Sequence, residues 1–166
     1  YKVQVFDLAR HLNERIYKRE VIPENIINGQ TVPSAELSEA QDVTKGLGEP
    51  IKYGYHDGLL RQLIEYRYTT CDFIQWYLNG VFLERLEWNH AEEFYSYFEH
   101  AQSWLDDLKW VENQVRINFF KRIQSPPIIV LSKRAFGFDL RETQRPAYTP
   151  RIVDYLTTQV LQIDWK

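Results

Sequence analysis

The chain has 166 residues, of which 44% are hydrophobic, 26% are charged and 15% are aromatic, and its net charge is −3. This length favours a single domain over residues 1–166, and this composition excludes an intrinsically disordered chain. The longest apolar run, at 126–131, is much shorter than the roughly 18 residues of a membrane-spanning helix, so no membrane span is predicted.

Cysteine content and the first residues of the chain predict an intracellular location. Cys71 is the only cysteine, which excludes an internal disulfide and fits the reducing cytoplasm or nucleus. The first residues show no basic stretch followed by an apolar one, so no signal peptide is predicted. Cys71 lies on an apolar stripe, and we interpret it as a core residue rather than a reactive thiol.

The N-terminal segment has the pattern of an amphipathic helix. Over residues 3–19, apolar side chains recur every three or four positions and are expected to face inward. Residues 23–56 are punctuated by proline, glycine and asparagine, which predicts a long irregular connection with one short helix at 35–44. The inward face of the N-terminal helix would consist of Val5, Leu8, Leu12 and Ile16.

A longer apolar stripe then follows the 3.6-residue period of an α-helix. It predicts a helix over 58–79 that Asp57 caps and that Gly80 ends in the left-handed conformation. An alternative stays open over 66–88, because Asn79-Gly80 is a favoured β-hairpin turn between strand-tolerant flanks. Those flanks lack strict alternation, which favours the helix. The stripe comprises Leu60, Ile64, Arg67, Cys71, Ile74, Leu78 and Val81.

A second stripe predicts a helix over 89–122, in which Asn89 and Glu92 form a capping-box pattern. A helix of about 34 residues would outreach a compact globule of this size, so we expect it either to break near 113–118 or to project. The two long helices are expected to pack as an antiparallel pair. The apolar members of the second are Phe94, Phe98, Ala101, Leu105, Leu108, Val111, Val115 and Phe119.

Two prolines at 126–127 end this helix, and residues 125–148 are expected to form an extended arm. Pro150 opens a final helix to about residue 162. The predicted fold is therefore mainly α: a helical bundle built on a long antiparallel helix pair, with a short extended or β-like arm near the C-terminus. The final helix would turn inward Ile152, Leu156, Val160 and Ile163.

Reactive groups form few recognisable patterns. Glu87-x-x-His90 has the spacing of a helical metal motif, but it has no second copy. His56-Asp57 is an adjacent acid and base, which is more typical of a loop beside a helix cap. No glycine-rich phosphate loop or nucleophile elbow is present. The sequence therefore predicts no catalytic, metal-binding or cofactor-binding residues.

Residues 109–151 form a basic and aromatic region that is the predicted partner-binding segment. This region carries nine basic and three acidic residues, whereas 57–107 carries three basic and ten acidic residues. Such opposite charges attract each other or an external partner. The predicted partner-binding residues are Lys121, Arg122, Lys133, Arg134, Phe136, Phe138, Arg141 and Arg145.

An excess of aromatic side chains beside few reactive groups predicts a non-catalytic subunit or adaptor. It would bind another protein through an aromatic-rich helical surface, and a homo-oligomer is compatible with the same surface. The first alternative is binding of single-stranded nucleic acid through the basic and aromatic region, because cations hold phosphates and rings stack on bases. The second alternative is an enzyme whose site is assembled from scattered residues.

Overall fold

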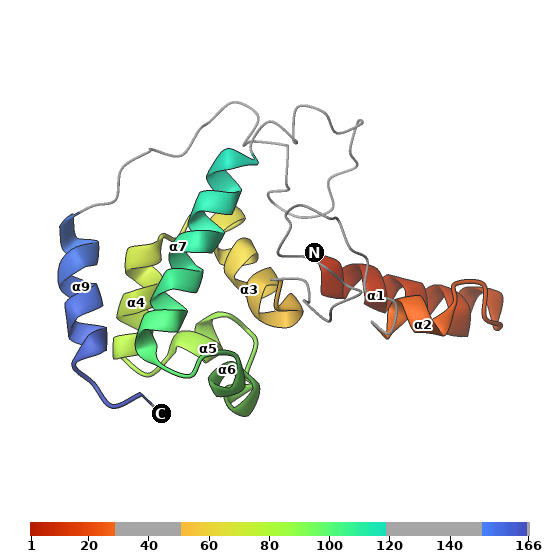
Figure 1. Cartoon of the computed structure of the whole chain (residues 1–166). Helices are drawn as coiled ribbons and strands as arrows, with labels where there is room; N and C mark the ends of the chain where they lie inside the picture. The colour runs from red at the N-terminus through yellow and green to blue at the C-terminus, as the bar shows by residue number, and fades with distance from the viewer. Residues whose placement is uncertain (29–50, 119–150, 166) are drawn as a thin grey trace, which may run out of the picture. The chain divides into compact units, whose positions relative to one another are not determined.

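The computed structural model describes residues 1–28, 51–118 and 151–165 (Figure 1). Within these residues the secondary structure is helical and contains no strand, which confirms a mainly α fold. The predicted helix at 35–44 and the predicted arm at 125–148 lie outside the described part.

Two compact units make up the chain, residues 1–57 and residues 58–166. The prediction of a single domain stays a prediction. In the described parts of both units, no helix combines the length and the apolar character that crossing a bilayer requires.

The first unit begins with an α-helix that continues as a π-helix. α1 (Lys2–His11) continues into η1 (Leu12–Tyr17), a π-helix, and α2 (Glu24–Ile27) packs against α1. Asn13 holds the loop between them. Its Oδ1 accepts from the backbone N–H groups of Val21 and Ile22 at 2.9 and 3.0 Å, and its Nδ2 donates to the Ile22 carbonyl at 2.8 Å. One buried side chain therefore satisfies three backbone groups of this turn.

The apolar face predicted for the N-terminal helix is not its buried face. Val5, Leu8 and Ile16 are 55%, 58% and 58% exposed. Phe6 is half-buried instead, and its ring contacts the Tyr53 ring in an edge-to-face arrangement with the ring centroids 6.2 Å apart. Of the four residues predicted to face inward only Leu12 is half-buried, so the predicted inward face is wrong.

α3 (Tyr53–Ile64) begins earlier than the helix predicted from residue 58, so Asp57 is not its cap. Asp57 is instead a residue of α3 itself, and its Oδ2 accepts a hydrogen bond from the backbone N–H of Val3 at 2.8 Å. Gly54 has a φ of 27°, which kinks the first turn. The apolar side chains that α3 buries are Tyr55, Leu59, Leu63 and Ile64, of which only Ile64 belongs to the predicted stripe.

The helix predicted over 58–79 is divided in two. α4 (Thr70–Leu78) starts only after a break in which Arg67 adopts a φ of 66°, a left-handed conformation that an α-helix cannot contain. Thr69 then begins α4, since its backbone N–H and its Oγ1 both donate to Asp72 Oδ2, at 2.7 and 2.6 Å. Cys71, on the first turn of α4, is half-buried rather than a core residue.

α4 ends as predicted, because Gly80 has a φ of 72° in the left-handed region. α5 (Phe82–Arg85) follows directly. Residues 66–88 thus contain two helices and no strand, so the hairpin alternative is wrong. The sequence favours helices here, because the flanks of Asn79-Gly80 carry apolar residues in doublets, whereas a half-buried strand needs strict alternation of apolar and polar residues.

Polar contacts join α3 to the end of α5. Arg61 donates to the Leu86 carbonyl at 3.0 Å, and Gln62 donates to the Arg85 carbonyl at 2.7 Å. The backbones approach closely here, because a Cβ atom on Gly58 would lie only 3.1 Å from the Leu86 oxygen. Glycine is the residue that permits this approach.

The helix predicted over 89–122 is also divided, into α6 (Ala91–Tyr97) and α7 (Ala101–Ile117). α6 starts after His90 with no side-chain cap, so the predicted Asn89 cap is wrong. His100 begins α7, because its Nδ1 accepts from the Ser103 backbone N–H at 3.1 Å. The predicted burial is nevertheless confirmed for Phe94, Phe98, Ala101, Leu105, Leu108, Val111 and Val115.

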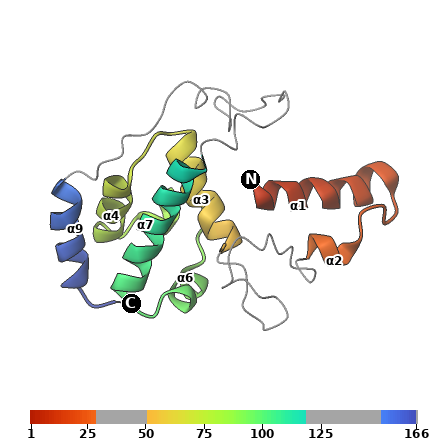
Figure 2. The ribbon, with the colours of Figure 1, turned by 45° about the horizontal axis from the view of Figure 1, so that its top comes forward.

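α9 (Arg151–Leu161) packs against α4 and α7, and the three helices lie side by side in both views (Figures 1 and 2). Leu156 and Val160 face inward as predicted, together with Val153. Ile152 and Ile163 are 56% and 42% exposed, so their predicted inward orientation is wrong. The described part of the second unit is therefore a bundle of short helices, without the long continuous pair that the two stripes predicted.

Candidate functional site

The predicted partner-binding residues are not placed by the structure. All of them, Lys121, Arg122, Lys133, Arg134, Phe136, Phe138, Arg141 and Arg145, lie outside the described residues. The candidate site argued below is therefore built from other side chains.

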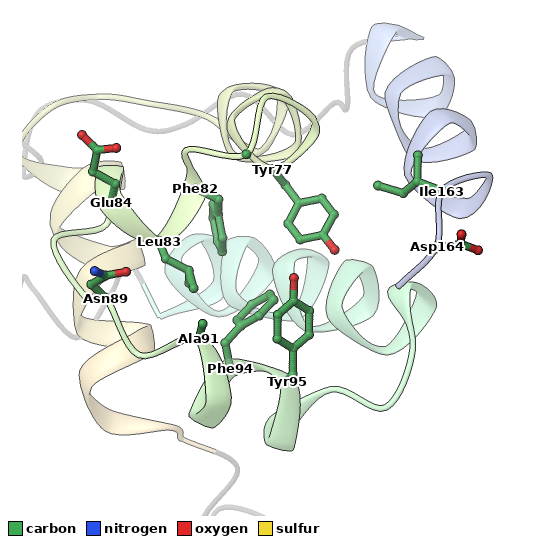
Figure 3. Close-up of a pocket in the computed structure, with 11 residues that line it drawn as sticks. Tyr77, Phe82, Leu83, Glu84, Asn89, Ala91, Phe94, Tyr95, Ile163 and Asp164 are labelled. Atoms are coloured by element: carbon green, nitrogen blue, oxygen red, sulfur yellow. The ribbon is translucent and has the colours of Figure 1, made fainter. Parts of the chain in front are cut away.

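An open pocket of about 610 Å³ lies in the second unit (Figure 3). We call it the aromatic pocket. Its walls come from the end of α4, from α5, from α6 and from the segment that follows α9. A volume of this size is typical of pockets that hold a small molecule or a large side chain with its neighbours. The lining residues are Tyr77, Gly80, Phe82, Leu83, Glu84, Asn89, Ala91, Phe94, Tyr95, Ile163 and Asp164.

The floor of the aromatic pocket belongs to the core. Phe82 and Phe94 are 3% and 1% exposed, and their ring centroids lie 5.7 Å apart in an edge-to-face contact. Trp104 of α7 lies behind both, at 5.2 Å from Phe82 and 6.1 Å from Phe94. Since Trp104 is fully buried, the floor is fixed in place by close packing rather than by solvent-exposed contacts.

Tyr77 and Tyr95 stand across the pocket, and their hydroxyl groups point toward each other (Figure 3). Both rings are half-buried. Burial raises the pKa of the Tyr77 hydroxyl well above its usual range, and a hydrogen bond with Tyr95 raises it further. Tyr77 therefore keeps its phenolic proton even at alkaline pH, and the pair offers hydroxyl groups and ring surface to the pocket.

The rim of the pocket is acidic. Glu84 and Asp164 are exposed carboxylates, and they lie on opposite sides of the tyrosine pair in Figure 3. Asn89 is exposed beside Glu84. None of the described residues that line the pocket is basic. The lining therefore carries two negative charges at neutral pH.

The segment after α9 reaches the pocket because Trp165 anchors it. The Trp165 Nε1 donates to the Phe98 carbonyl at 2.9 Å, and its ring stacks on Tyr77 at 5.2 Å. Phe98 is the C-cap residue of α6 and lies at the break between α6 and α7. The break in the predicted long helix thus supplies the acceptor that positions Ile163 and Asp164.

The reactive pairs found in the sequence have local roles. His56 and Asp57 are both buried, and each accepts a backbone N–H: His56 Nδ1 from Lys52 at 3.0 Å, and Asp57 as described above. His90 Nδ1 lies 3.8 Å from Glu93 Oε2 rather than beside Glu87. Within the described residues, no three ligand side chains are grouped so that they would hold a metal ion.

No family model matches this chain, and no match was found among curated proteins or among solved structures. The residues themselves are therefore the basis on which function is argued.

The aromatic pocket was not predicted from the sequence. Its walls come from residues 77–95 and 163–164, which are distant in the chain. The sequence assigned Phe94 to a core stripe and gave Trp165 no role. The available signal was Trp165 itself, a large ring beyond the predicted end of the last helix, where no helical neighbour would cover it.

Proposed function

We propose that this protein is a non-catalytic interaction subunit, and that the aromatic pocket is where a partner protein inserts an anchoring side chain. The observation that carries the proposal is the pair of half-buried tyrosines above a floor of buried rings. Tyrosine presents a large, stiff surface with one polar atom, and such residues concentrate binding energy at protein interfaces. A preformed floor adds to affinity, because little side-chain freedom is lost on binding.

The basic and aromatic residues between 121 and 145 belong to the same proposal as a second contact surface. Their support is the sequence alone: cations and rings interleaved beside an acidic half of the chain. Reversing Lys121, Arg122, Lys133 and Arg134 to glutamate should weaken capture of an acidic partner. Unchanged capture would remove this segment from the proposal and leave the aromatic pocket as the contact.

The experiment is affinity capture from the source cells with three forms of the full chain, followed by a direct binding measurement on the partner that is recovered. The forms are wild type, Tyr95→Ala in the pocket, and Tyr155→Ala as the matched control. Tyr155 lies on the outer face of α9 and is 63% exposed, away from the pocket lining.

The wild-type and Tyr155→Ala forms should bind the partner equally. Tyr95→Ala should weaken binding by about 2 kcal/mol, the loss typical of an interface hot spot. Circular dichroism of both variants checks that they fold. Equal binding by all three folded forms would overturn the proposal.

A further inference from the structure

We propose that the side chain held in the aromatic pocket is an arginine of the partner protein. This inference rests on the proposed function and specifies its chemistry. It is carried by the charge of the rim, the ring surface between the two acids, and the acidic character of the surrounding segment.

The rim gives the first reason. Glu84 and Asp164 are the charged members of the lining, and both are negative. A cationic group in the pocket would be attracted by the negative charge of this lining, whereas a carboxylate or phosphate would be repelled. Both acids are exposed to solvent, and no basic side chain lines the pocket beside them.

The ring surface gives the second reason. Tyr77 and Tyr95 lie between the two acids and offer half-buried aromatic faces and uncharged hydroxyl groups. A guanidinium is planar, stacks on such faces and donates several hydrogen bonds in a fixed geometry. A lysine ammonium is a compact, strongly hydrated charge that gains less from ring faces, so arginine is the better occupant.

The surrounding field gives the third reason. Residues 57–107, which build three walls of the pocket, carry a net charge of −7. Two of the acids in this segment, Glu92 and Glu93, lie in the first turn of α6, close to Tyr95 in the chain. A field of one sign steers an oppositely charged side chain of the partner toward the pocket.

The experiment is a binding titration followed by NMR on the whole chain. The probe is a short glycine and serine peptide with one central arginine, and its matched control is the same peptide with citrulline, which keeps the shape of arginine but has no charge. We expect saturable shifts at Gly80, Tyr95 and Ile163 with the arginine peptide, and binding of the citrulline peptide at least several-fold weaker.

Variants of the rim acids test whether arginine binds at the aromatic pocket. Neutralising both rim acids, with Glu84→Gln and Asp164→Asn, should weaken binding of the arginine peptide about two- to fivefold, as expected for one exposed ion pair, and should leave binding of the citrulline peptide unchanged. The control variant carries Glu99→Gln and Asp106→Asn. These acids are exposed but do not line the pocket, so the net charge changes equally while arginine binding should persist.

Three results would overturn the arginine assignment: equal binding of the two peptides, equal weakening by the control variant, or no saturable shift at the pocket residues. Failure here is distinguishable from failure of the proposed function. A partner that is lost with Tyr95→Ala but retained with Glu84→Gln and Asp164→Asn keeps the pocket as an interface and removes arginine as its occupant. A partner retained by all folded variants removes both.

Discussion

Trp104 is the side chain on which most of the aromatic packing depends. It is fully buried on α7 and contacts rings from four other segments, including Tyr77 at 4.5 Å and Trp165 at 5.9 Å. The same ring backs the floor of the aromatic pocket. The stability of the bundle and the shape of the candidate site therefore share one residue.

Replacing Trp104 by alanine should lower the free energy of unfolding by about 3–5 kcal/mol, because it leaves a large cavity that the surrounding rings cannot fill. Urea denaturation measures this loss. Trp110→Ala on the same helix is the matched control, since Trp110 is only half-buried and should cost clearly less. An equal loss for both variants would contradict the central role given to Trp104.

Tyr97 makes stability sensitive to alkaline pH. Its hydroxyl donates to a carboxylate oxygen of Glu93. Burial, followed by this hydrogen bond, raises the pKa of Tyr97 from 10.0 to about 12. The folded state therefore holds the phenolic proton more tightly than the unfolded state does, so this contribution is complete below pH 10.0 and is lost as pH rises toward 12.

The measurement is the free energy of unfolding as a function of pH for wild type and Tyr97→Phe. The wild type should lose stability between pH 10.0 and about 12 more steeply than the variant, which has no proton to lose at this position. Parallel curves over this range would show that the Tyr97 hydroxyl does not contribute. Tyr77 titrates in the same direction in both proteins and so cancels in the comparison.

Helix breaks account for most differences between the predicted and the observed secondary structure. The apolar periodicity predicted that these segments are helical, and it predicted nearly all of the residues that are buried between 94 and 115, because a 3.6-residue repeat is a local property of the chain. The periodicity did not predict where each helix is interrupted. The break before α7 leaves Phe98 buried with extended backbone, so the stripe continues through a residue that is not helical.

Capping residues decide where the second helix of each pair begins. Thr69-x-x-Asp72 is a capping-box pattern that is hard to recognise in the sequence, because it lies inside an apolar stripe. His100 is less recognisable, because histidine is not among the preferred N-cap residues. Tertiary packing of Phe98 selects that break instead.

The cap of α7 can be tested with His100→Ala. The variant loses the acceptor for the Ser103 backbone N–H and should lower the free energy of unfolding by about 0.5–2 kcal/mol. Gln102→Ala, exposed on the first turn of the same helix, is the control and should change stability little. Chemical denaturation measures both, and no loss with His100→Ala would show that the cap is dispensable.

Contacts between distant segments complete the second unit. α9 covers α4 and α7, and Trp165 binds the break between α6 and α7 through the Phe98 carbonyl. The inward face of α9 consists of Val153, Leu156 and Val160, shifted from the predicted face at both ends. The last helix is thus an integral part of the core and of the aromatic pocket.

A charge on the inner face of α9 should detach it. Val160 is fully buried, so Val160→Asp would place a carboxylate among apolar side chains and should cost more than about 3 kcal/mol. Tyr155→Asp on the outer face is the control and should be tolerated, because Tyr155 is 63% exposed. Hydrogen exchange of α4 and α7 should rise only in the first variant. Unchanged exchange would mean that α9 does not protect them.

The sequence by itself determined the mainly helical class, the end of α4 at Gly80, and most of the side chains between 94 and 115 that are buried, although not Trp104. These depend on periodicity and local backbone preference, which each segment expresses on its own. Tertiary structure decided the rest: the breaks at 65–69 and 98–100, the rotated faces of α1 and α9, and the aromatic pocket. Each of these depends on which distant ring or carbonyl a residue meets, as Phe6 meets Tyr53 and Trp165 meets Phe98. Such contacts cannot be predicted from the spacing of residues along the chain.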